Sequence, residues 1–182
     1  KKSGADAVKF QTFKVENYIS VHQKERFKRL KKFQLTFEEF SKLKNYSNKK
    51  GLFFLSTPFD IESSNFLKKI CACLKISSGD NNYYELIENT IKSNKPIIIS
   101  TGFTKESEIK KLYKFVLKKK GLKFVKDKFA LLHCIASYPT NSYDTNLNVI
   151  KNLKKKYKCK IGFSDHSRSN IPAICCVSLG VK

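Results

Sequence analysis

Short apolar runs alternate with longer amphipathic segments along nearly the whole chain, and this alternation restricts the fold more than any other feature. The apolar runs are rich in β-branched and aromatic residues and predict strands buried on both faces: residues 7–13, 52–59, 73–78, 97–101, 130–135 and 160–164. The segments between them have helical spacing; within residues 109–117, for example, apolar side chains recur on one face and lysines fill the other. A repeated strand–helix order is typical of a parallel sheet with crossover helices.

The spacing of these units favours one parallel architecture over another. Neither a G-x-G-x-x-G motif nor a P-loop follows any predicted strand, which counts against a nucleotide-binding doubly wound sheet. A repeat of roughly 25 to 50 residues suits a (β/α)8 barrel, which needs about 250 residues. The chain has 182 residues and no Met, so we interpret it as an internal piece of a longer protein. We therefore predict an α/β fold, a TIM barrel that is incomplete, with about six of its eight units in residues 1–182.

The net charge is strongly positive. Lys and Arg total 37 and Asp and Glu total 15, so the formal charge is +22, which is typical of proteins that bind phosphate groups. However, Arg26, Arg29 and Arg168 are the only arginines, although Arg is favoured for bidentate phosphate and base contacts. The lysines are spread along the whole chain, which favours a solvated exterior. A non-catalytic nucleic-acid-binding module remains an alternative from a different functional class.

Cysteine usage and hydropathy indicate the compartment. The six cysteines form no C-x-x-C pair, and most lie among apolar residues, so we expect buried free thiols rather than a structural zinc site. No apolar run is long enough to span a bilayer, and the N-terminus has no secretory signal pattern. We predict a cytoplasmic protein that does not contact a membrane.

Polar residues gather where the predicted strands end, and catalysis in a barrel occurs at the carboxyl ends of the strands. Lys9 and Lys75 each lie inside an otherwise apolar strand, where an unpaired charge would be costly. Together with hydroxyl residues on neighbouring strand ends, they predict an anion clamp. A single such hydroxyl would be explained by helix capping, but four strand ends share this character.

Two histidines also end strands. Imidazole is a common metal ligand, and Asp165 could orient or neutralise a site at His166. From spacing alone, a hydrogen-bonded core histidine is the more common interpretation of both residues, and a metal role is better supported for His166 than for His133. His22 lies in a predicted loop.

Six strand-end motifs, taken in order and spacing, resemble the sialic acid synthase family. They are GADAVKFQTF at 4–13, LSTPFD at 55–60, KISSGD at 75–80, PIIISTG at 96–102, LHC at 132–134 with YPT at 138–140, and GFSDH at 162–166. The resemblance implies a metal-dependent barrel enzyme. Such an enzyme joins phosphoenolpyruvate to an N-acylated amino sugar aldehyde, such as N-acetylmannosamine, and gives a nine-carbon 2-keto acid and phosphate.

The resemblance also implies a role for individual residues. The phosphoenolpyruvate clamp would fall on Lys9, Thr57, Lys75, Ser78, Ser100 and Ser164, and the sugar contacts on Gln11, Phe59, Asp80 and Tyr138. A Mn²⁺ or Mg²⁺ ion would be held by His166 and by a second histidine beyond Lys182. We expect Lys9, Lys75 and His133 to be catalytic, with His133 as a pocket or supporting residue rather than the principal ligand.

Several features depart from the family pattern. The family's first strand with its Glu, its last strand with the second His, and a C-terminal antifreeze-like domain would all lie outside this chain. That domain reaches the partner subunit's site in bacterial members, so we expect a homodimer of the full-length protein. Asp80 stands where many members have Glu, Ala136 where some have a polar contact, and Arg168 where a small or apolar residue is usual. The acceptor sugar stays open, as does a deoxy-octulosonate or deoxy-heptulosonate type of aldol synthase.

Overall fold

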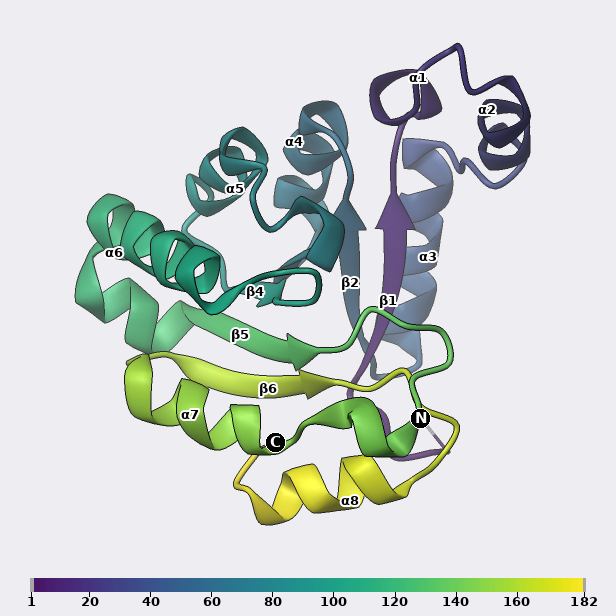
Figure 1. Cartoon of the computed structure of the whole chain (residues 1–182). Coiled ribbons are helices and arrows are strands. Elements are labelled where there is room, and N and C mark those ends of the chain that lie inside the picture. The colour runs from purple at the N-terminus through teal and green to yellow at the C-terminus, as the bar shows by residue number, and fades with distance from the viewer. Residues whose placement is uncertain (1, 182) are drawn as a thin grey trace. The chain divides into compact units, whose positions relative to one another are not determined.

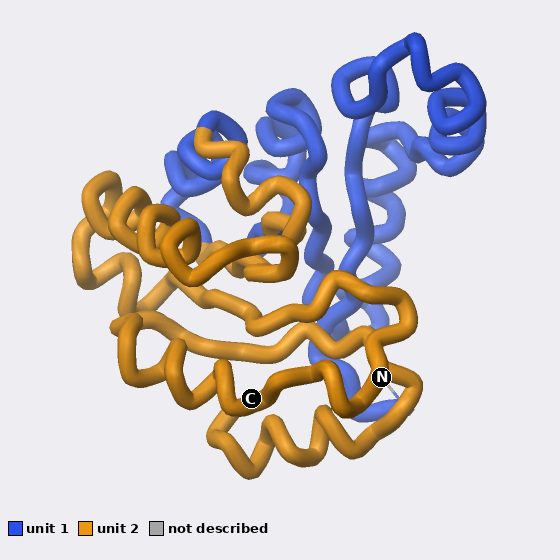
Figure 2. The backbone as a smooth tube through the Cα atoms, viewed as in Figure 1, with its two compact units in different colours: residues 1–75, 85–95 blue, residues 76–84, 96–182 orange. Residues whose placement is uncertain are grey.

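The computed structural model describes residues 2–181, which divide into two compact units. The first unit comprises the chain up to residue 75 together with residues 85–95, and the second comprises residues 76–84 and the chain from residue 96 onward. Figure 2 shows the two units in different colours. Each unit contains parallel strands and the helices that follow them, so the predicted strand–helix order is confirmed.

The first unit is built on β1 (Ala7–Thr12), β2 (Phe53–Pro58) and the start of β3 (Leu74–Ile76). Its helices are α1 (Val15–Tyr18), α2 (Lys24–Lys31), α3 (Phe37–Lys49), α4 (Ile61–Ile70) and most of α5 (Tyr84–Ile91). β1 pairs in parallel with β2, and β2 pairs in parallel with β3 through Ser56 and Leu74. Figure 1 shows α3 running alongside these strands.

The core of the first unit lies between the strands and helices α3 and α4. Phe40, Phe54, Leu67 and Leu74 are buried in one cluster, and Phe10 stacks on Phe54 with ring centroids 5.4 Å apart. Because side chains alternate along a strand, the residues next to these in sequence point to the opposite face. That opposite face carries the polar strand-end residues of this unit.

The second unit is built on β4 (Ile97–Ser100), β5 (Phe129–Cys134) and β6 (Lys160–Ser164), again paired in parallel and in chain order. Its helices are α6 (Glu106–Lys128), which is interrupted at Gly121, α7 (Asn148–Lys156) and α8 (Ile171–Ser178). Two short 3-10 turns, η1 (Ser78–Asp80) and η2 (Ser142–Thr145), follow β3 and β5. The six predicted strands therefore all exist, with the third shortened to Leu74–Ile76.

The strands of the second unit have two chemically different faces. His133 pairs in register with Phe163, and the residues on this face pack toward the helices. On the other face, Cys134 pairs with Ser164 and Leu132 pairs with Gly162. A Cβ atom at Gly162 would lie 2.4 Å from Cδ2 of Leu132, so any larger residue here would displace the Leu132 side chain.

No helix among residues 2–181 is both long enough and apolar enough to cross a membrane.

Candidate functional site

Four predicted site residues share one face of the first unit. Gln11 lies in register with Thr57, and Lys9 with Leu55, on the face opposite the Phe54 cluster. Lys75 follows Leu74, which is in that cluster, so alternation directs the Lys75 side chain to the same face as Thr57. The structure therefore brings Lys9, Gln11, Thr57 and Lys75 onto one face, as the strand-end pattern predicts.

The two lysines of this face differ in their exposure to solvent. Lys75 is only 9% exposed, whereas Lys9 keeps access to solvent. Partial burial nevertheless lowers the pKa of Lys9, because removal from water disfavours its charged form. An anion bound beside Lys9 would replace the hydration that its ammonium group loses by burial.

Phe59 has a different setting. Its ring lies 4.7 Å from that of Tyr18 and 6.4 Å from that of Phe13, measured between centroids. This half-buried aromatic cluster fixes the start of the segment after β2. A sugar contact through Phe59 stays a prediction.

In the second unit, polar side chains converge on His166. Its Nδ1 lies 2.9 Å from the carbonyl oxygen of Ile135, and its Nε2 lies 3.2 Å from the hydroxyl of Tyr138 and 3.4 Å from that of Ser164. A carbonyl can only accept, so this contact places the proton on Nδ1 and leaves the lone pair on Nε2. The Tyr138 ring also stacks on the imidazole, with centroids 4.2 Å apart.

A thiol connects His166 to the end of β3. The sulfur of Cys134 lies 3.9 Å from Nδ1 of His166, and it accepts a hydrogen bond of 3.5 Å from the hydroxyl of Ser78. The Ser78 oxygen in turn accepts a hydrogen bond of 3.1 Å from the amide of Gly102. Cys134 was absent from the predicted site, but its place two residues after Leu132 puts it on the same face as Ser164.

Asp80 and Ser100 lie beside this group. The Asp80 carboxylate accepts a hydrogen bond from the hydroxyl of Ser77, and burial raises the pKa of Asp80. Ser100 is buried at the end of β4, and its carbonyl accepts a hydrogen bond from the side chain of Asn81. Asn81 lies before α5, which begins at Tyr84, and its side-chain amide faces β4.

His133 lies on the opposite face of β5 from Cys134. Its Nε2 is 2.7 Å from the carbonyl oxygen of Thr145, and its ring stacks on Phe163 at 5.9 Å between centroids. Burial lowers the pKa of His133, which favours the neutral imidazole. The structure therefore does not place His133 next to His166, and a direct catalytic role for it stays a prediction.

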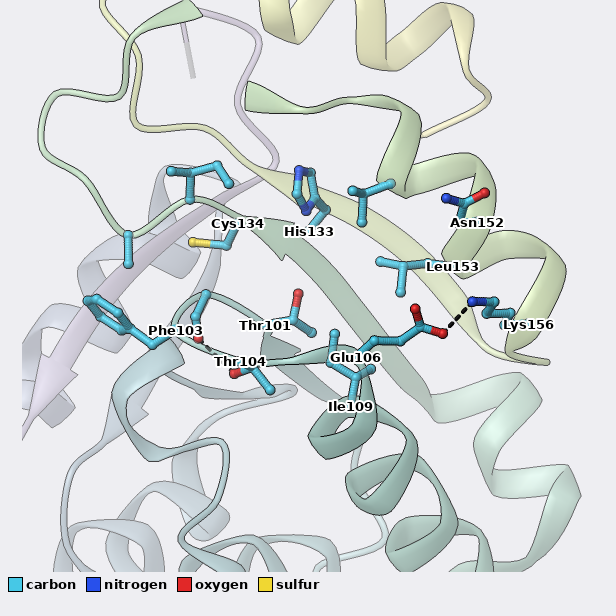
Figure 3. A pocket seen from close by; sticks show the side chains of 14 residues that line it. Thr101, Phe103, Thr104, Glu106, Ile109, His133, Cys134, Asn152, Leu153 and Lys156 are labelled. Atoms are coloured by element: carbon cyan, nitrogen blue, oxygen red, sulfur yellow. Dashed lines mark hydrogen bonds and ion pairs between the residues drawn. The ribbon is translucent and has the colours of Figure 1, made fainter. Parts of the chain in front are cut away.

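A pocket of about 420 Å³ lies between β5, the loop after β4, and helices α6 and α7. Its walls include Thr101, Phe103, Ile109, His133 and Leu153. Figure 3 shows these side chains, with an ion pair between Glu106 and Lys156 at one end. The pocket reaches Cys134 and Gly102, so it borders the group around Ser78.

For a metal ion, the described residues offer one well-prepared ligand. Histidines that bind metals usually donate their other ring N–H to a carbonyl or carboxylate, which is the arrangement of His166 with Ile135. Within residues 2–181, three or more His, Cys, Asp or Glu side chains do not come together in a group that could hold a metal. Asp165 accepts a hydrogen bond from the amide of Ser167 and so stabilises its own loop.

The chain is similar to known proteins along nearly its whole length. The chain is 41% identical over 181 residues to an uncharacterized protein of Methanocaldococcus jannaschii, covering 99% of this chain and 52% of that protein. It is 35% identical over 192 residues to the N,N'-diacetyllegionaminic acid synthase of Campylobacter jejuni, covering 98% of this chain and 57% of that enzyme. The chain thus spans about half the length of these relatives.

Among solved structures, the N-acetylneuraminic acid (sialic acid) synthetase of Leptospira borgpetersenii superimposes with a TM-score of 0.90 at 37% sequence identity. The match covers 99% of this chain and 61% of that one, and it confirms the predicted fold as an incomplete (β/α)8 barrel domain. The NeuB family model matches residues 1–182, and the chain therefore belongs to the NeuB family, whose members include legionaminic, pseudaminic and sialic acid synthases.

Proposed function

We propose that this chain forms part of an enzyme that condenses phosphoenolpyruvate with an N-acylated amino sugar aldehyde, giving a nine-carbon 2-keto acid and phosphate. The observation that carries this proposal is the set of strand-end side chains within a NeuB-family sequence. Lys9, Thr57 and Lys75 belong to it in the first unit. Ser78, Ser100 and Ser164 belong to it in the second unit.

In this proposal the two lysines bind the anionic groups of phosphoenolpyruvate. The substrate carries a carboxylate and a phosphate. Removing either anion from water costs free energy, which a nearby positive charge offsets. Lys9 and Lys75 supply that charge from fixed strands, so their contribution is electrostatic and positional. The Ser78 hydroxyl adds a donor. Its proton is held only by the Cys134 sulfur, a weak acceptor, and it can turn to an anion at little cost.

His166 would hold Mn²⁺ or Mg²⁺ through Nε2, since Ile135 fixes its tautomer. The bound ion would supply Lewis-acid polarisation of the sugar aldehyde oxygen. Tyr138 and Ser164 already place their hydroxyls at Nε2, so they are suited to hydrogen-bond groups that bind there.

The sugar contacts in this proposal are Gln11, Phe59, Asp80 and Tyr138. The raised pKa of Asp80 extends to higher pH the range in which its carboxyl is protonated and can donate a hydrogen bond. His133 would act from behind the site by supporting the end of β5. We also propose a cytoplasmic homodimer for the full-length protein, which size determination of that protein would test.

The other functions considered have less support. Membership in the NeuB family favours an amino sugar over the acceptors of deoxy-octulosonate and deoxy-heptulosonate synthases. Similarity to an N,N'-diacetyllegionaminic acid synthase supports an acylated amino sugar in particular. A nucleic-acid-binding module would need its charges clustered on the outside, whereas Lys75 is buried within a strand.

The test is release of phosphate from phosphoenolpyruvate by the full-length protein. The assay contains Mn²⁺ and either N-acetylmannosamine or a diacetamido sugar. We expect phosphate release that depends on the sugar. Absence of release with every amino sugar would contradict the proposal. Lys75→Met keeps the side-chain length and removes the charge, and we expect it to lower turnover by about 100-fold. Lys123→Met, at an exposed position of α6, is the matched control.

A further inference from the structure

Asn81 joins the turn after β3 to the loop after β4. Its side chain is 6% exposed, and its Nδ2 donates to the carbonyl oxygens of Ser100 and Gly102, both at 3.1 Å, and to the hydroxyl oxygen of Thr104. The Thr104 hydroxyl donates its own proton to the Gly102 carbonyl at 2.8 Å, so its oxygen is free to accept. One buried amide therefore holds three positions of this loop.

The orientation of this amide follows from its partners. Two of the three acceptors are carbonyl oxygens, which cannot donate, so only the nitrogen of Asn81 can face them. The contacts thus require asparagine in one orientation. A carboxylate of the same shape would face two carbonyl oxygens and be repelled.

The loop held by Asn81 has an unfavourable backbone conformation. Phe103 has a φ of 57°, in the left-handed region that aromatic residues rarely adopt, and its side chain is 83% exposed. Because the Phe103 side chain is exposed, hydrophobic burial does not compensate for the strained backbone at this residue. The residues on either side of Phe103 are Gly102 and Thr104, both bound by Asn81. Figure 3 shows Phe103 and Thr104 together at one side of the pocket.

The position of this loop decides where the Ser78 hydroxyl lies. The Gly102 amide donates to the Ser78 oxygen at 3.1 Å. A Cβ atom at Gly102 would lie 2.8 Å from the Ser78 oxygen and 3.2 Å from the Cβ atom of Ala136, so the backbone fits closely between them. A shift of the loop would therefore move or release Ser78.

We infer that Asn81 is a positioning residue that holds Ser78 and Ser100 at a fixed spacing for an anionic substrate. With the Gly102 amide filling one lone pair of Ser78, the hydroxyl proton of Ser78 can turn from the Cys134 sulfur, a weak acceptor, to the anion. Naming phosphoenolpyruvate as that anion rests on the function proposed above.

The variant that tests this inference is Asn81→Asp, which keeps the shape and replaces the donor by an acceptor. Asn82→Asp, at the exposed neighbouring position, is the matched control because it changes the charge equally. Asn81→Ala is the second variant. It removes the donor without adding repulsion, so it serves if the aspartate variant does not fold.

The first measurement is hydrogen exchange of backbone amides by NMR in this chain. In the Asn81 variants we expect the exchange rate of the Gly102 amide to increase. This increase should exceed the average increase for core amides, such as that of Leu131, by at least about tenfold. Asn82→Asp should leave both rates unchanged. A purely stabilising role would speed all core amides equally, and that result, or an unchanged Gly102 rate, would overturn the inference.

The second measurement is the dissociation constant for phosphoenolpyruvate with Mg²⁺, by calorimetry. We expect both Asn81 variants to bind roughly tenfold more weakly and Asn82→Asp to bind normally. Normal binding by a folded Asn81 variant would overturn the role in substrate binding. If the unaltered protein does not bind phosphoenolpyruvate, the proposed function fails, whereas the exchange rates still decide whether Asn81 positions Ser78.

Discussion

At the scale of single residues, adjacent positions on β5 have separate chemistry. Cys134 contacts Ser78 and lies near His166, while His133 hydrogen-bonds Thr145 on the helix side. The imidazole is 5% exposed and faces a carbonyl that accepts from Nε2. Burial lowers its pKa, which makes His133 a source of pH-dependent stability.

The sign of this dependence follows from the two pKa values. The unfolded chain binds a proton near the ordinary value of 6.5, whereas folded His133 binds it only at lower pH. We therefore expect the free energy of unfolding to fall as the pH drops below 6.5. His133→Gln keeps a donor for Thr145 and should flatten this decline, as urea unfolding at several pH values would show. His22→Gln, at an exposed position, is the control, and an equal slope in both variants would contradict the assignment.

A second residue-scale prediction concerns the close approach of β5 and β6. Gly162→Ala would place a Cβ atom 2.4 Å from Leu132 Cδ2, so we expect a loss of about 1–3 kcal/mol in the free energy of unfolding. Urea unfolding measures this loss. Combining it with Leu132→Val should restore part of the stability, since the shorter side chain makes room. Additive losses in the double variant would show that Leu132 is not the cause.

At the scale of elements, local signals in the sequence identified most of the fold. Thr36 followed three residues later by Glu39 is a sequence signal for a helix start, and the structure has a capping box between these two residues at the start of α3. Asp is also a favoured N-cap residue, and the Asp60 carboxylate caps α4 by accepting a hydrogen bond of 2.7 Å from the amide of Ser63. Both interactions join residues that are three positions apart, so the two partners can be recognised together in the sequence.

The contacts of Asn81 and Cys134 could not be predicted in this way. Asn81 binds Gly102, and Cys134 binds Ser78, which are 21 and 56 positions away in the chain. These pairings depend on how the strands align, which no local pattern encodes. Side-chain alternation on β5 could place Cys134 on the site face, but its contact with Ser78 depends on how β5 lies relative to the turn after β3.

The capping box allows an element-scale prediction. Thr36→Ala removes the oxygen that accepts from the Glu39 amide at 3.2 Å, so we expect a loss of about 1 kcal/mol in unfolding free energy. Glu39→Ala removes the reciprocal acceptor of the Thr36 amide at 2.7 Å. In urea unfolding, the double variant should lose less than the sum of the single losses. Full additivity would mean that the two halves of the box act independently.

At the scale of the whole molecule, the charge of +22 is distributed rather than concentrated. Several lysines pair with nearby carboxylates, as Lys14 does with Glu62 at 2.7 Å and Lys42 with Glu38 at 2.7 Å. Exposed pairs of this kind add little stability. They agree with the interpretation of the lysines as a solvated exterior.

This distribution predicts weak, non-specific behaviour toward nucleic acid. We expect a filter-binding titration near physiological salt to retain neither RNA nor DNA, because phosphate-binding affinity falls steeply with salt unless many contacts form together. Saturable retention with a steep salt dependence would contradict this prediction and revive the binding-module alternative. The phosphate-release assay on the same preparation would show whether both activities exist.

The opposite orientation of His133 and Cys134 has a practical consequence. One peptide bond separates the His133 imidazole, which contacts Thr145 on the helix side, from the Cys134 thiol, which contacts Ser78 on the opposite face. Selective isotope labelling of the two side chains would provide two NMR reporters at a single point of the backbone. A ligand that perturbs the Cys134 signal alone binds on the side of His166. A ligand that shifts both signals either binds in the pocket that both residues line or moves the strand.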